Sequence, residues 1–475
     1  MPDETPEKFS SPNPFRTAAG PPRGGSASLP ACAALQACAA LRAARSAPER
    51  AAGPPRTPIP SPRPTDSWLF LGSVFPRSWE GAYRLTPWPT ILAQRGLLAA
   101  LAGEGWRPER ILTTPPVRRS PPARPQLFGD EPEGRLEGLP EVPLVALGQT
   151  NLEPLKTLSI AAHLGRELRR WVQECEQEGR RPRLLVYNLG PTHEQGGFLA
   201  RLRARLPFDL CPLITDLDAP GDSGSRLRHV RFRWQARLPR AADRLMALNR
   251  SVLDDFGEGR PTLETGGIVA DRDLWERLLA LLPPEPSSQG PRRFLYAGSL
   301  NEVRGIRRLL EAMADFDPAE ARLEVTGGGP LAEEVRARAA TLPQVDYLGS
   351  LITLEDRLAA FARAEVVVNP HAIAAPEARY LWPSKLAEYA ASGRCVVSST
   401  AGGMDPSAHP WGLWSASDDP AALHSLLRST LDSDFPLAAR GKAAQAWSRE
   451  RFAPGPAARR MLRFLEVPES GGNLS

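Results

Sequence analysis

The sequence predicts an α/β protein with two doubly wound domains, and three observations carry that prediction. A chain of 475 residues is too long for a single hydrophobic core. The stretch 67–116 has the order strand, glycine-containing loop, helix and strand, which opens many doubly wound domains. The stretch 364–400 repeats the order strand, loop, helix and strand, so both halves share one α/β alternation.

The overall composition is that of a soluble globular protein. Hydrophobic residues make up 42% of the chain and charged residues 24%, and no run of eighteen or more apolar residues predicts a membrane span. The formal net charge of +5 suits a nucleotide ligand or an anionic membrane surface. This mild basicity gives no argument for nucleic acid binding, and none is expected.

Cysteine and histidine usage predicts neither disulfides nor a structural metal. The five cysteines are scattered, form no CxxC pair and are odd in number, which predicts reduced thiols and a cytoplasmic location. The six histidines lack the spacing of a zinc site. We therefore expect no metal and no cofactor.

Residues 1–65 are expected to form a disordered extension rich in proline, alanine and arginine. Within it, residues 29–47 could form a short alanine-rich helix. A transit peptide is the alternative, because arginines outnumber acidic residues there. The serine-rich amphipathic signature of such peptides is poor, which favours a plain extension.

The first folded domain is expected over residues 66–249. Buried strands are predicted where short apolar or β-branched runs end in polar or turn residues, and helices where apolar residues recur at helical spacing. A long surface loop is predicted over the Pro/Arg/Gly-rich residues 117–140. The strands are expected at 67–76, 110–116, 141–147 and 181–191, and a further strand followed by an acidic loop at 209–222. The helices are expected at 89–106, at 151–179 as one long helix or two stacked helices, at 196–206, and at 225–249, the last leading into a strand.

The stretch 364–400 predicts an anion site. Its helix begins near Pro383 and Ser384 and ends at Gly393, and its N-terminus presents unpaired N–H groups and a positive dipole end. Lys385 adds a full charge there. Glu388 follows one turn later, where its carboxylate could bind a vicinal diol such as a ribose. Together these features describe a site for a nucleotide diphosphate.

Two further turns follow predicted strands of the second half. Gly298 ends the strand at 294–298, and the loop after it places Arg304 before Gly305 and a helix. An arginine at such a turn can bind a diphosphate through two hydrogen bonds, although a surface arginine is the plainer alternative. A second turn could let backbone approach a ligand, or could simply be a tight strand-to-helix turn. It is formed by Gly327, Gly328 and Gly329.

Polar side chains also follow two strands of the first half. Asn188 ends one strand, Asp216 and Asp218 follow another, and ligands bind at such carboxyl ends of open α/β sheets. Asp216 and Asp218 are an acceptor-site pair or a solvated acidic loop. His193 could act as a base toward an acceptor, although a lone histidine is more often structural.

Arginines alternate with apolar residues over 225–240. This basic helix could lie on an anionic membrane surface or pack on its own domain, and packing is the commoner outcome.

Taken together, these motifs resemble the retaining GT-B glycosyltransferases of the large group 1 class (glycosyltransferase family 4). The resemblance rests on four motifs in family order: FLYAGSLNEVRGIRRLLEAM, LEVTGGGPLAEEVRARA, VDYLGSLITLEDRLAAFARAEVVVNP and the PSKLAEYAASG helix with the strand after it. It implies two Rossmann-like parallel-sheet domains with a cleft between them. Residues 66–249 would form the acceptor domain, 250–445 the nucleotide-sugar domain, and 446–475 a C-terminal helix crossing back, with a tail.

The same resemblance implies roles for single residues. Glu388 matches the glutamate that holds the ribose, and Leu386 belongs to the same helix motif. Gly81 corresponds to a glycine near the acceptor. The chain departs from the family at Tyr380, where a glutamate normally contacts the donor sugar; Glu377 or His371 could take its place. Ser299 also replaces a common arginine.

The function implied is transfer of a sugar, with retention, from a UDP- or GDP-sugar to a glycan, lipid-linked or small-molecule acceptor. The site would need no metal, because Arg304 and Lys385 could neutralise the leaving group. His193, Asp218 and Glu377 are the candidate catalytic residues, and Asn188 and Asp216 lie on the acceptor side. Two alternatives are a GT-B-like binding subunit without turnover and a nucleotide-sugar epimerase. The epimerase would require more acid and base residues than the cleft offers.

Overall fold

The structure is a computed structural model of the chain. It describes residues 66–82, 88–114, 134–150, 155–188, 195–217, 219, 226–265, 272–281, 290–351, 353–400 and 404–466. These ranges all belong to one unit that begins at Pro54. The predicted extension over residues 1–65, with its short helix, lies outside the described residues.

The first sheet has the strand order β3-β4-β2-β1-β5-β6-β7-β8. All neighbouring strands are parallel except β3 and β4, which are antiparallel. The order reverses between β1 and β5, so their carboxyl ends mark the switch point at which ligands bind in open α/β sheets. The strands are β1 (Asp66–Gly72), β2 (Arg110–Thr113), β3 (Gly134–Leu136), β4 (Leu139–Ala146), β5 (Arg181–Tyr187), β6 (Asp209–Ile214), β7 (Leu245–Ala247) and β8 (Thr262–Glu264).

Alternate residues of each parallel strand enter cores on opposite faces of this sheet. Phe70 and Leu185 belong to the core that contains α2 (Trp88–Gly103) and α15 (Pro454–Glu466), while Leu71 and Leu184 belong to the core that contains α3 (Leu155–Gln177) and α4 (Gln195–Arg203). Strands buried on both faces explain the nearly continuous apolar runs in the sequence. The helices of this half are η2 (Arg77–Ala82), α2 (Trp88–Gly103), α3 (Leu155–Gln177), α4 (Gln195–Arg203), α5 (Arg226–Gln235), α6 (Arg237–Ala241) and α7 (Arg250–Phe256).

The second sheet is parallel throughout its described pairs and has the order β11-β10-β9-β12-β13-β14. Counted from its first strand this is 3-2-1-4-5-6, the Rossmann order, and its switch point lies between β9 and β12. The strands are β9 (Arg292–Ala297), β10 (Ala321–Thr326), β11 (Val345–Gly349), β12 (Val366–Asn369), β13 (Cys395–Ser399) and β14 (Leu413–Ser415).

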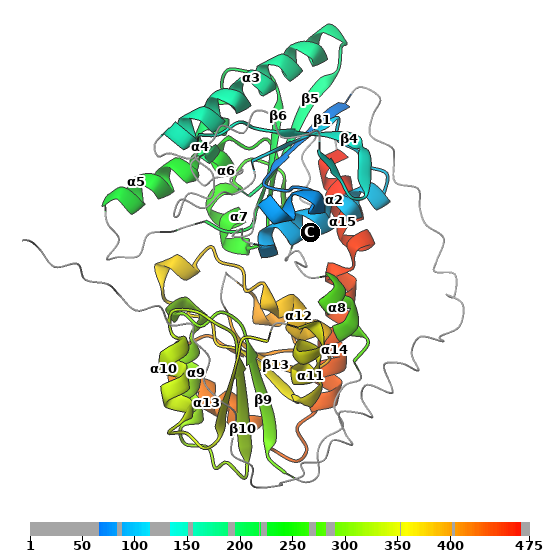
Figure 1. The fold of residues 1–475 in the computed structure, drawn as a ribbon. Helices are drawn as coiled ribbons and strands as arrows, with labels where there is room; N and C mark the ends of the chain where they lie inside the picture. The colour runs from blue at the N-terminus through cyan, green and yellow to red at the C-terminus, as the bar shows by residue number, and fades with distance from the viewer. Residues whose placement is uncertain are drawn as a thin grey trace, which may run out of the picture. The chain divides into compact units, whose positions relative to one another are not determined.

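Helices cover both faces of this second sheet (Figure 1). Helices α9, α10 and α13 share a core with Phe294 and Val368, while α8, α11, α12 and α14 share another with Leu295 and Val367. The helices are α8 (Arg272–Leu279), η3 (Glu302–Arg304), α9 (Ile306–Met313), α10 (Ala332–Ala339), α11 (Leu354–Arg363), η4 (Pro376–Ala378), α12 (Lys385–Ala391), η6 (Pro406–Ala408), α13 (Pro420–Ser429), α14 (Leu437–Phe452) and α15 (Pro454–Glu466). Two parallel-sheet α/β domains are thus confirmed.

The structure differs from the predicted elements at three places. The end of the predicted loop 117–140 contains the β3–β4 hairpin, because Leu136 and Leu139 are buried and Gly138 takes the turn with φ 85°. The first sheet continues beyond residue 249, since β8 pairs with β7. The C-terminal segment is two helices rather than one, because Ala453 is extended before Pro454, which cannot continue a helix.

Helix α15 packs on α2 of the first half. The guanidinium of Arg183, on β5, donates to the carbonyl of Leu465 at 2.6 Å, and Arg244 donates to the carbonyl of Phe464 at 3.0 Å. Arg459 also pairs with Glu104 just after α2, at 2.6 Å. The last helix therefore completes the core of the first half. No described helix is both long and apolar enough to cross a membrane.

Candidate functional site

The loops that follow β9 and β12 meet at the switch point of the second sheet. Gly305 adopts a left-handed conformation with φ 69° between η3 and α9. A Cβ atom at this position would lie 1.6 Å from the carbonyl oxygen of Pro370, so only glycine fits. The amide of Ala372 also donates to the carbonyl of Val303 at 2.9 Å. The two loops are therefore in direct backbone contact.

The loop after β9 positions Arg304 through local hydrogen bonds. The hydroxyl of Tyr296 donates to the carbonyl of Ser299 at 2.7 Å. The side chain of Asn301 then accepts from the amide of Arg304 at 3.0 Å and caps η3. This turn explains why an asparagine precedes the arginine by three residues.

His371, from the loop after β12, holds the Arg304 side chain. The guanidinium Nη1 lies 2.7 Å from Nε2 of His371, whose side chain is fully buried. Burial, followed by the positive charge of Arg304, lowers the pKa of His371 to about 4. The imidazole is neutral near pH 7, and its Nε2 accepts from the guanidinium, which can only donate.

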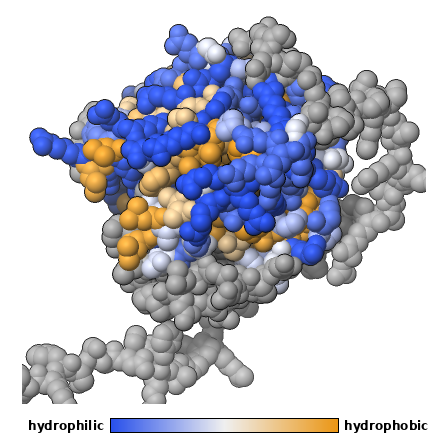
Figure 2. Space-filling view, turned by 90° about the horizontal axis from the view of Figure 1, so that it is seen from above, coloured by the Kyte–Doolittle hydropathy of each residue, from blue (hydrophilic) through white to orange (hydrophobic). Residues whose placement is uncertain are grey.

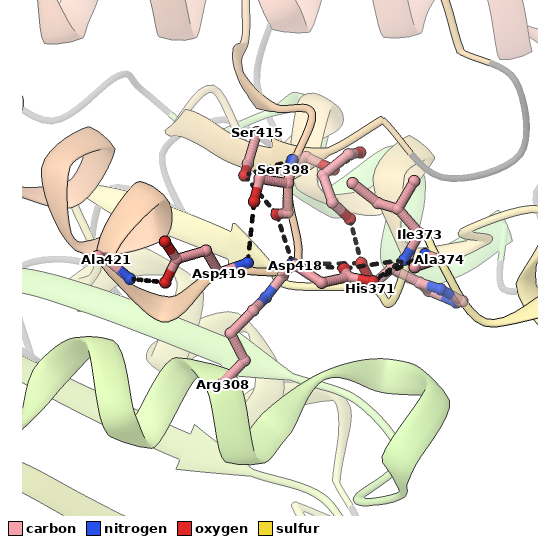
Figure 3. A network of polar contacts seen from close by, with 11 residues as sticks. Arg308, His371, Ile373, Ala374, Ser398, Ser415, Asp418, Asp419 and Ala421 are labelled. Atoms are coloured by element: carbon pink, nitrogen blue, oxygen red, sulfur yellow. Dashed lines mark hydrogen bonds and ion pairs between the residues drawn. The ribbon is translucent and has the colours of Figure 1, made fainter.

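A second polar network fixes the backbone at His371 and just after it (Figure 3). The Asp418 carboxylate accepts from the amides of Ile373, at 2.9 and 3.0 Å, and Ala374, at 2.7 Å. Arg308 pairs with Asp418 at 2.7 Å and also donates to the carbonyl of His371 at 3.3 Å. Because Arg308 is buried, desolvation lowers its pKa. These contacts fix the backbone that carries the His371 ring.

The glycine turn after β10 packs on the loop after β9. Gly327 and Gly329 have φ values of 135° and 153°, and Cβ atoms there would lie 1.8 Å from the Gly298 carbonyl oxygen and 2.4 Å from that of Leu300. A Cβ at Gly328 would lie 3.0 Å from Oγ of Ser350. Close packing between the two loops is thus sufficient reason for Gly327 and Gly329.

Helix α12 begins beside the end of β9. The hydroxyl of Tyr389 accepts from the amide of Ala297 at 2.8 Å and donates to its carbonyl at 3.1 Å. Lys385 pairs with the largely buried Glu388 at 2.8 Å. Of the other predicted residues, Pro383 and Leu386 are buried, and Ser384 is exposed without a side-chain capping bond.

A cavity of about 470 Å³ opens beside η3, within the usual size range of ligand sites. Arg304 is the predicted donor-site residue that lines it, while Lys385 and Glu388 do not. Burial raises the pKa of Tyr389, whose hydroxyl bonds to Ala297 at the end of β9. The lining residues are Asn301, Glu302, Val303, Arg304, Pro330, Leu331 and Leu381.

Tyr380, which stands where the sequence resemblance would place a glutamate, points away from the cavity. Tyr380 is buried, and its hydroxyl donates to Asp255 of α7, in the first half, at 2.6 Å. Its side chain therefore contacts the first half instead of lining the cavity. Glu377 lies in η4, three residues earlier in the chain.

Predicted residues of the acceptor side come together at the ends of β5 and β6. Asn188 adopts φ 55° and its amide donates to Asp216 at 2.8 Å. Gly81 lies in η2. His193 and Asp218 lie outside the described residues. Within the described ranges, no group of three or more His, Cys, Asp or Glu residues could hold a metal ion.

Sequence reasoning missed several residues that build this region. Asn249 caps α7 and donates to carbonyls of the loop before α12, and Asp255 pairs with that loop. The Asn-Arg-Ser sequence at the start of α7 is a readable capping signal. The contacts of Asn249 with Arg379 and Leu381 could not be predicted, because these residues lie 130 and 132 positions away in the chain.

Comparisons with known proteins agree with this geometry. Residues 291–433 match the family model described as Glycosyl transferases group 1. No curated protein sequence matches the chain.

Solved glycosyltransferase structures share the fold. Sucrose-phosphate synthase from Thermosynechococcus elongatus is similar with a TM-score of 0.56 and 16% identity, covering 84% of this chain and 98% of that one. HepE from Anabaena in complex with UDP gives 0.53 and 15%, covering 84% and 99%. The apo lipopolysaccharide outer core galactosyltransferase WaaB gives 0.56 and 12%, covering 84% and 100%. The resemblance seen in the sequence is thus confirmed: residues 291–433 match the group 1 glycosyl transferases, and the described chain has the GT-B fold.

Proposed function

We propose that this protein transfers a sugar, with retention of configuration, from a nucleotide diphosphate sugar to a glycan, lipid-linked or small-molecule acceptor. The observation that carries the proposal is Arg304, which lines a cavity at the switch point of the sheet that matches the group 1 family. A guanidinium in that place can form charge-assisted bonds with a diphosphate.

The leaving group is the reason for cations in this site. Breaking the bond between sugar and phosphate leaves negative charge on the diphosphate, while the sugar acquires oxocarbenium character. In our proposal Arg304, held by neutral His371, neutralises that negative charge. Lys385, at the start of α12, contributes a second positive charge. The backbone N–H of Lys385 would add a further donor, since the amides of Ser384 and Leu386 already donate to the carbonyls of Trp382 and Pro383. Glu388 would bind the ribose. This assignment gives charge neutralisation to side chains rather than to a metal or other cofactor.

We infer UDP or GDP as the nucleotide, and the UDP complex of the structurally similar HepE supports testing UDP first. The acceptor side is assigned to the ends of β5 and β6, where Asn188 and Asp216 can bind hydroxyl groups. His193, Asp218 and Glu377 remain the proposed catalytic residues. His193 and Asp218 follow the same strand ends in the sequence, and Glu377 precedes α12.

A peripheral contact with a membrane is also proposed, which would suit a lipid-linked acceptor. Helix α5 exposes Leu227 by 77% and Val230 by 62%, among the arginines 226, 228, 231 and 233. Only its C-terminal part packs inward, where Phe198 meets Trp234 edge-on. Figure 2 shows hydrophobic patches separated by hydrophilic side chains on one face of the molecule. The free, buried thiols of Cys175, Cys211 and Cys395 support a cytoplasmic location.

Thermal denaturation with UDP, GDP, ADP and their sugar conjugates tests the donor site. A ligand at one hundred times its dissociation constant stabilises the native protein by about 2.7 kcal/mol. We expect one nucleotide to raise the melting temperature of the wild type and to lose that effect in Glu388→Ala. Glu333→Ala is the matched control, because Glu333 forms a similar pair with Arg336, three residues on, on exposed α10.

Turnover separates the transferase from a binding subunit. Release of free nucleotide from the stabilising sugar conjugate supports the enzyme. Stabilisation without any release favours the binding subunit, which the orientation of Tyr380 makes a specific alternative. No stabilisation by any nucleotide would contradict both.

A further inference from the structure

The loop between β12 and α12 is fixed to the first half of the protein by a set of contacts that we call the latch. The latch consists of Asn249 and Asp255 on one side and Arg379 and Tyr380 on the other. It lies next to Leu381, which lines the cavity beside η3.

Asn249 supplies the backbone contacts of the latch. Its Oδ1 accepts from the amide of Ser251 at 2.7 Å and so caps α7. Its Nδ2 donates to the carbonyls of Arg379 at 3.0 Å and Leu381 at 3.2 Å. The side chain is fully buried, so all three bonds are shielded from water. A helix cap in the first half thus fixes the backbone of a loop that belongs to the second.

Asp255 supplies the charged contacts. Its two oxygens accept from Arg379 at 2.7 and 2.9 Å, and one also accepts from the Tyr380 hydroxyl at 2.6 Å. The bond from Arg379 is the main reason that the pKa of Asp255 lies below its usual range. Bidentate arginine–carboxylate pairs fix geometry as well as charge.

The Tyr380 ring completes the latch through apolar contacts. It stacks on Phe232 of α5, with ring centroids 5.8 Å apart and planes 16° apart, and it lies 5.9 Å from Phe256 of α7. Tyr380 is 6% exposed and belongs to the core of the first half. Burial raises the pKa of its phenol to about 12, so the hydroxyl keeps its proton near neutral pH and can donate to Asp255.

The loop is held at two ends by different partners. Asp418 binds the amides of Ile373 and Ala374 at its start, within the second sheet. The latch binds Arg379 to Leu381 near its end, just before Lys385. The position of the cavity wall at Leu381 therefore depends on residues of α7, which lie more than 120 positions earlier in the chain.

We propose that Asn249 and Asp255 are positioning residues that hold the loop 376–384 in its binding geometry and thereby set the affinity of the cavity for nucleotide. The proposal rests on the proposed function for the identity of the ligand. Tyr380 would then act through Asp255 rather than by contact with the donor.

Two measurements on Asp255→Ala test the proposal: hydrogen exchange of backbone amides and binding of UDP by calorimetry. We expect amides of residues 376–384 to exchange about tenfold faster or more, since bonds to a charged group are worth about 1.5–3 kcal/mol. Amides of β9 to β13 should keep their protection. The dissociation constant for UDP, or for the nucleotide that stabilises the wild type, should rise about five- to tenfold.

Two further variants sharpen this test. Tyr380→Phe keeps the ring contacts and loses one hydrogen bond, so its effects should be smaller and in the same direction. Asp254→Ala, on the same helix, breaks an exposed pair with Arg250 and should change neither measurement. If Asp255→Ala fails to fold, Tyr380→Phe alone decides the outcome.

The outcomes separate the two proposals. A wild type that binds nucleotide, with unchanged affinity in Asp255→Ala and Tyr380→Phe, overturns the latch proposal and leaves the proposed function intact. Faster exchange spread evenly over the whole protein also overturns it, because it would show a general loss of stability. A wild type that binds no nucleotide overturns the proposed function and with it the claim about affinity.

Discussion

The two sheets share one strand order through their first six parallel strands but carry different chemistry at their switch points. In the first sheet, the loop after β1 is held by the buried side chain of Gln94. Its Oε1 accepts from the amide of Ser73 at 2.9 Å, and its Nε2 donates to the Ser73 hydroxyl at 2.8 Å. Asn188 and Asp216 complete that edge. In the second sheet, the backbone of Gly305 packs directly against the carbonyl of Pro370. The polar side chains at this switch point are Arg304 and His371.

On the proposed function, this difference would let one topology serve two ligands. The strand order fixes where ligands bind, and the loops decide what is bound. An amide and a carboxylate suit the hydroxyl groups of an acceptor, whereas a guanidinium suits a diphosphate. The contrast also concerns rigidity, because a side chain such as Gln94 can shift, whereas a backbone contact cannot. Each of the following experiments perturbs one side of this comparison.

The largest effect is expected from Gly305→Ala. The new methyl group would strike the Pro370 carbonyl, and alanine is also strained at φ 69°. Left-handed strain of 1–2 kcal/mol together with overpacking of 1–3 kcal/mol predicts a loss of about 3 kcal/mol or more. Urea or thermal unfolding measures it.

Two glycine variants serve as controls for that result. Gly259→Ala has a similar φ of 74° but open space around the Cβ, so it should show only the strain. At the first switch point, Gly72→Ala would meet the side-chain oxygen of Gln94 at 2.1 Å and a ring carbon of Phe70 at 2.8 Å. Both are side-chain atoms that can shift, so we expect a loss of roughly 1–2 kcal/mol. Equal losses for Gly305→Ala and Gly72→Ala would contradict the difference in rigidity.

The second prediction separates the two chemistries. Arg304→Ala should weaken nucleotide binding by about ten- to a hundredfold, since a charge-assisted bond is worth about 1.5–3 kcal/mol. Arg304→Lys keeps the charge but not the paired donors and should fall between. Asp216→Asn, at the other switch point, should leave nucleotide affinity within about twofold. Calorimetric titration measures the affinity of all three variants. A large loss of nucleotide affinity in Asp216→Asn would contradict the prediction, because it would indicate that the nucleotide binds at the first sheet.

The smallest effect concerns pH and His371. Its pKa of about 4 lies below the ordinary 6.5, so the unfolded chain binds the proton more readily than the folded protein does. The stability that neutral His371 contributes is therefore present above pH 6.5 and is lost as the pH falls toward 4. Between pH 8 and pH 5 the loss should be about 2 kcal/mol.

His371→Gln isolates that contribution. Glutamine keeps an acceptor near the position of Nε2 but cannot take a proton in this range. Unfolding free energies at pH 8 and pH 5 should then differ by about 2 kcal/mol less than in the wild type. His229→Gln, on exposed α5, is the control. An unchanged pH dependence in His371→Gln would show that the imidazole is not held neutral.

Strands and helices with strong local patterns could be predicted from the sequence, and the exceptions have physical reasons. β12 contains three consecutive valines and β13 contains two, so the β-branched composition of these short buried runs indicates their type. The β3–β4 hairpin was hidden in a Pro/Arg/Gly-rich stretch, where the apolar residues Leu136 and Leu139 become buried. The three residues of β8 are too few to show a period.

The candidate site follows the same division. Arg304 could be proposed because strand, loop and helix are adjacent in the chain. Its partner His371 lies 67 residues away, and the outcome at Tyr380 depends on Asp255, 125 residues away. Pairing at such distances is set by tertiary packing, which one sequence does not display. The break between α14 and α15 was not predicted, although Pro454 is a local signal for it, since proline disfavours a helical conformation in the residue before it.

Helix α15 has a consequence for synthesis on the ribosome. Residues of the first sheet emerge well before residues 454–466, yet Arg183 and Arg244 find the carbonyls of Leu465 and Phe464 only in that last helix. Until residues 454–466 have been synthesised, the apolar side of α2 that α15 covers stays open to solvent and to chaperones. The first half therefore cannot complete its core before α15 has left the ribosome.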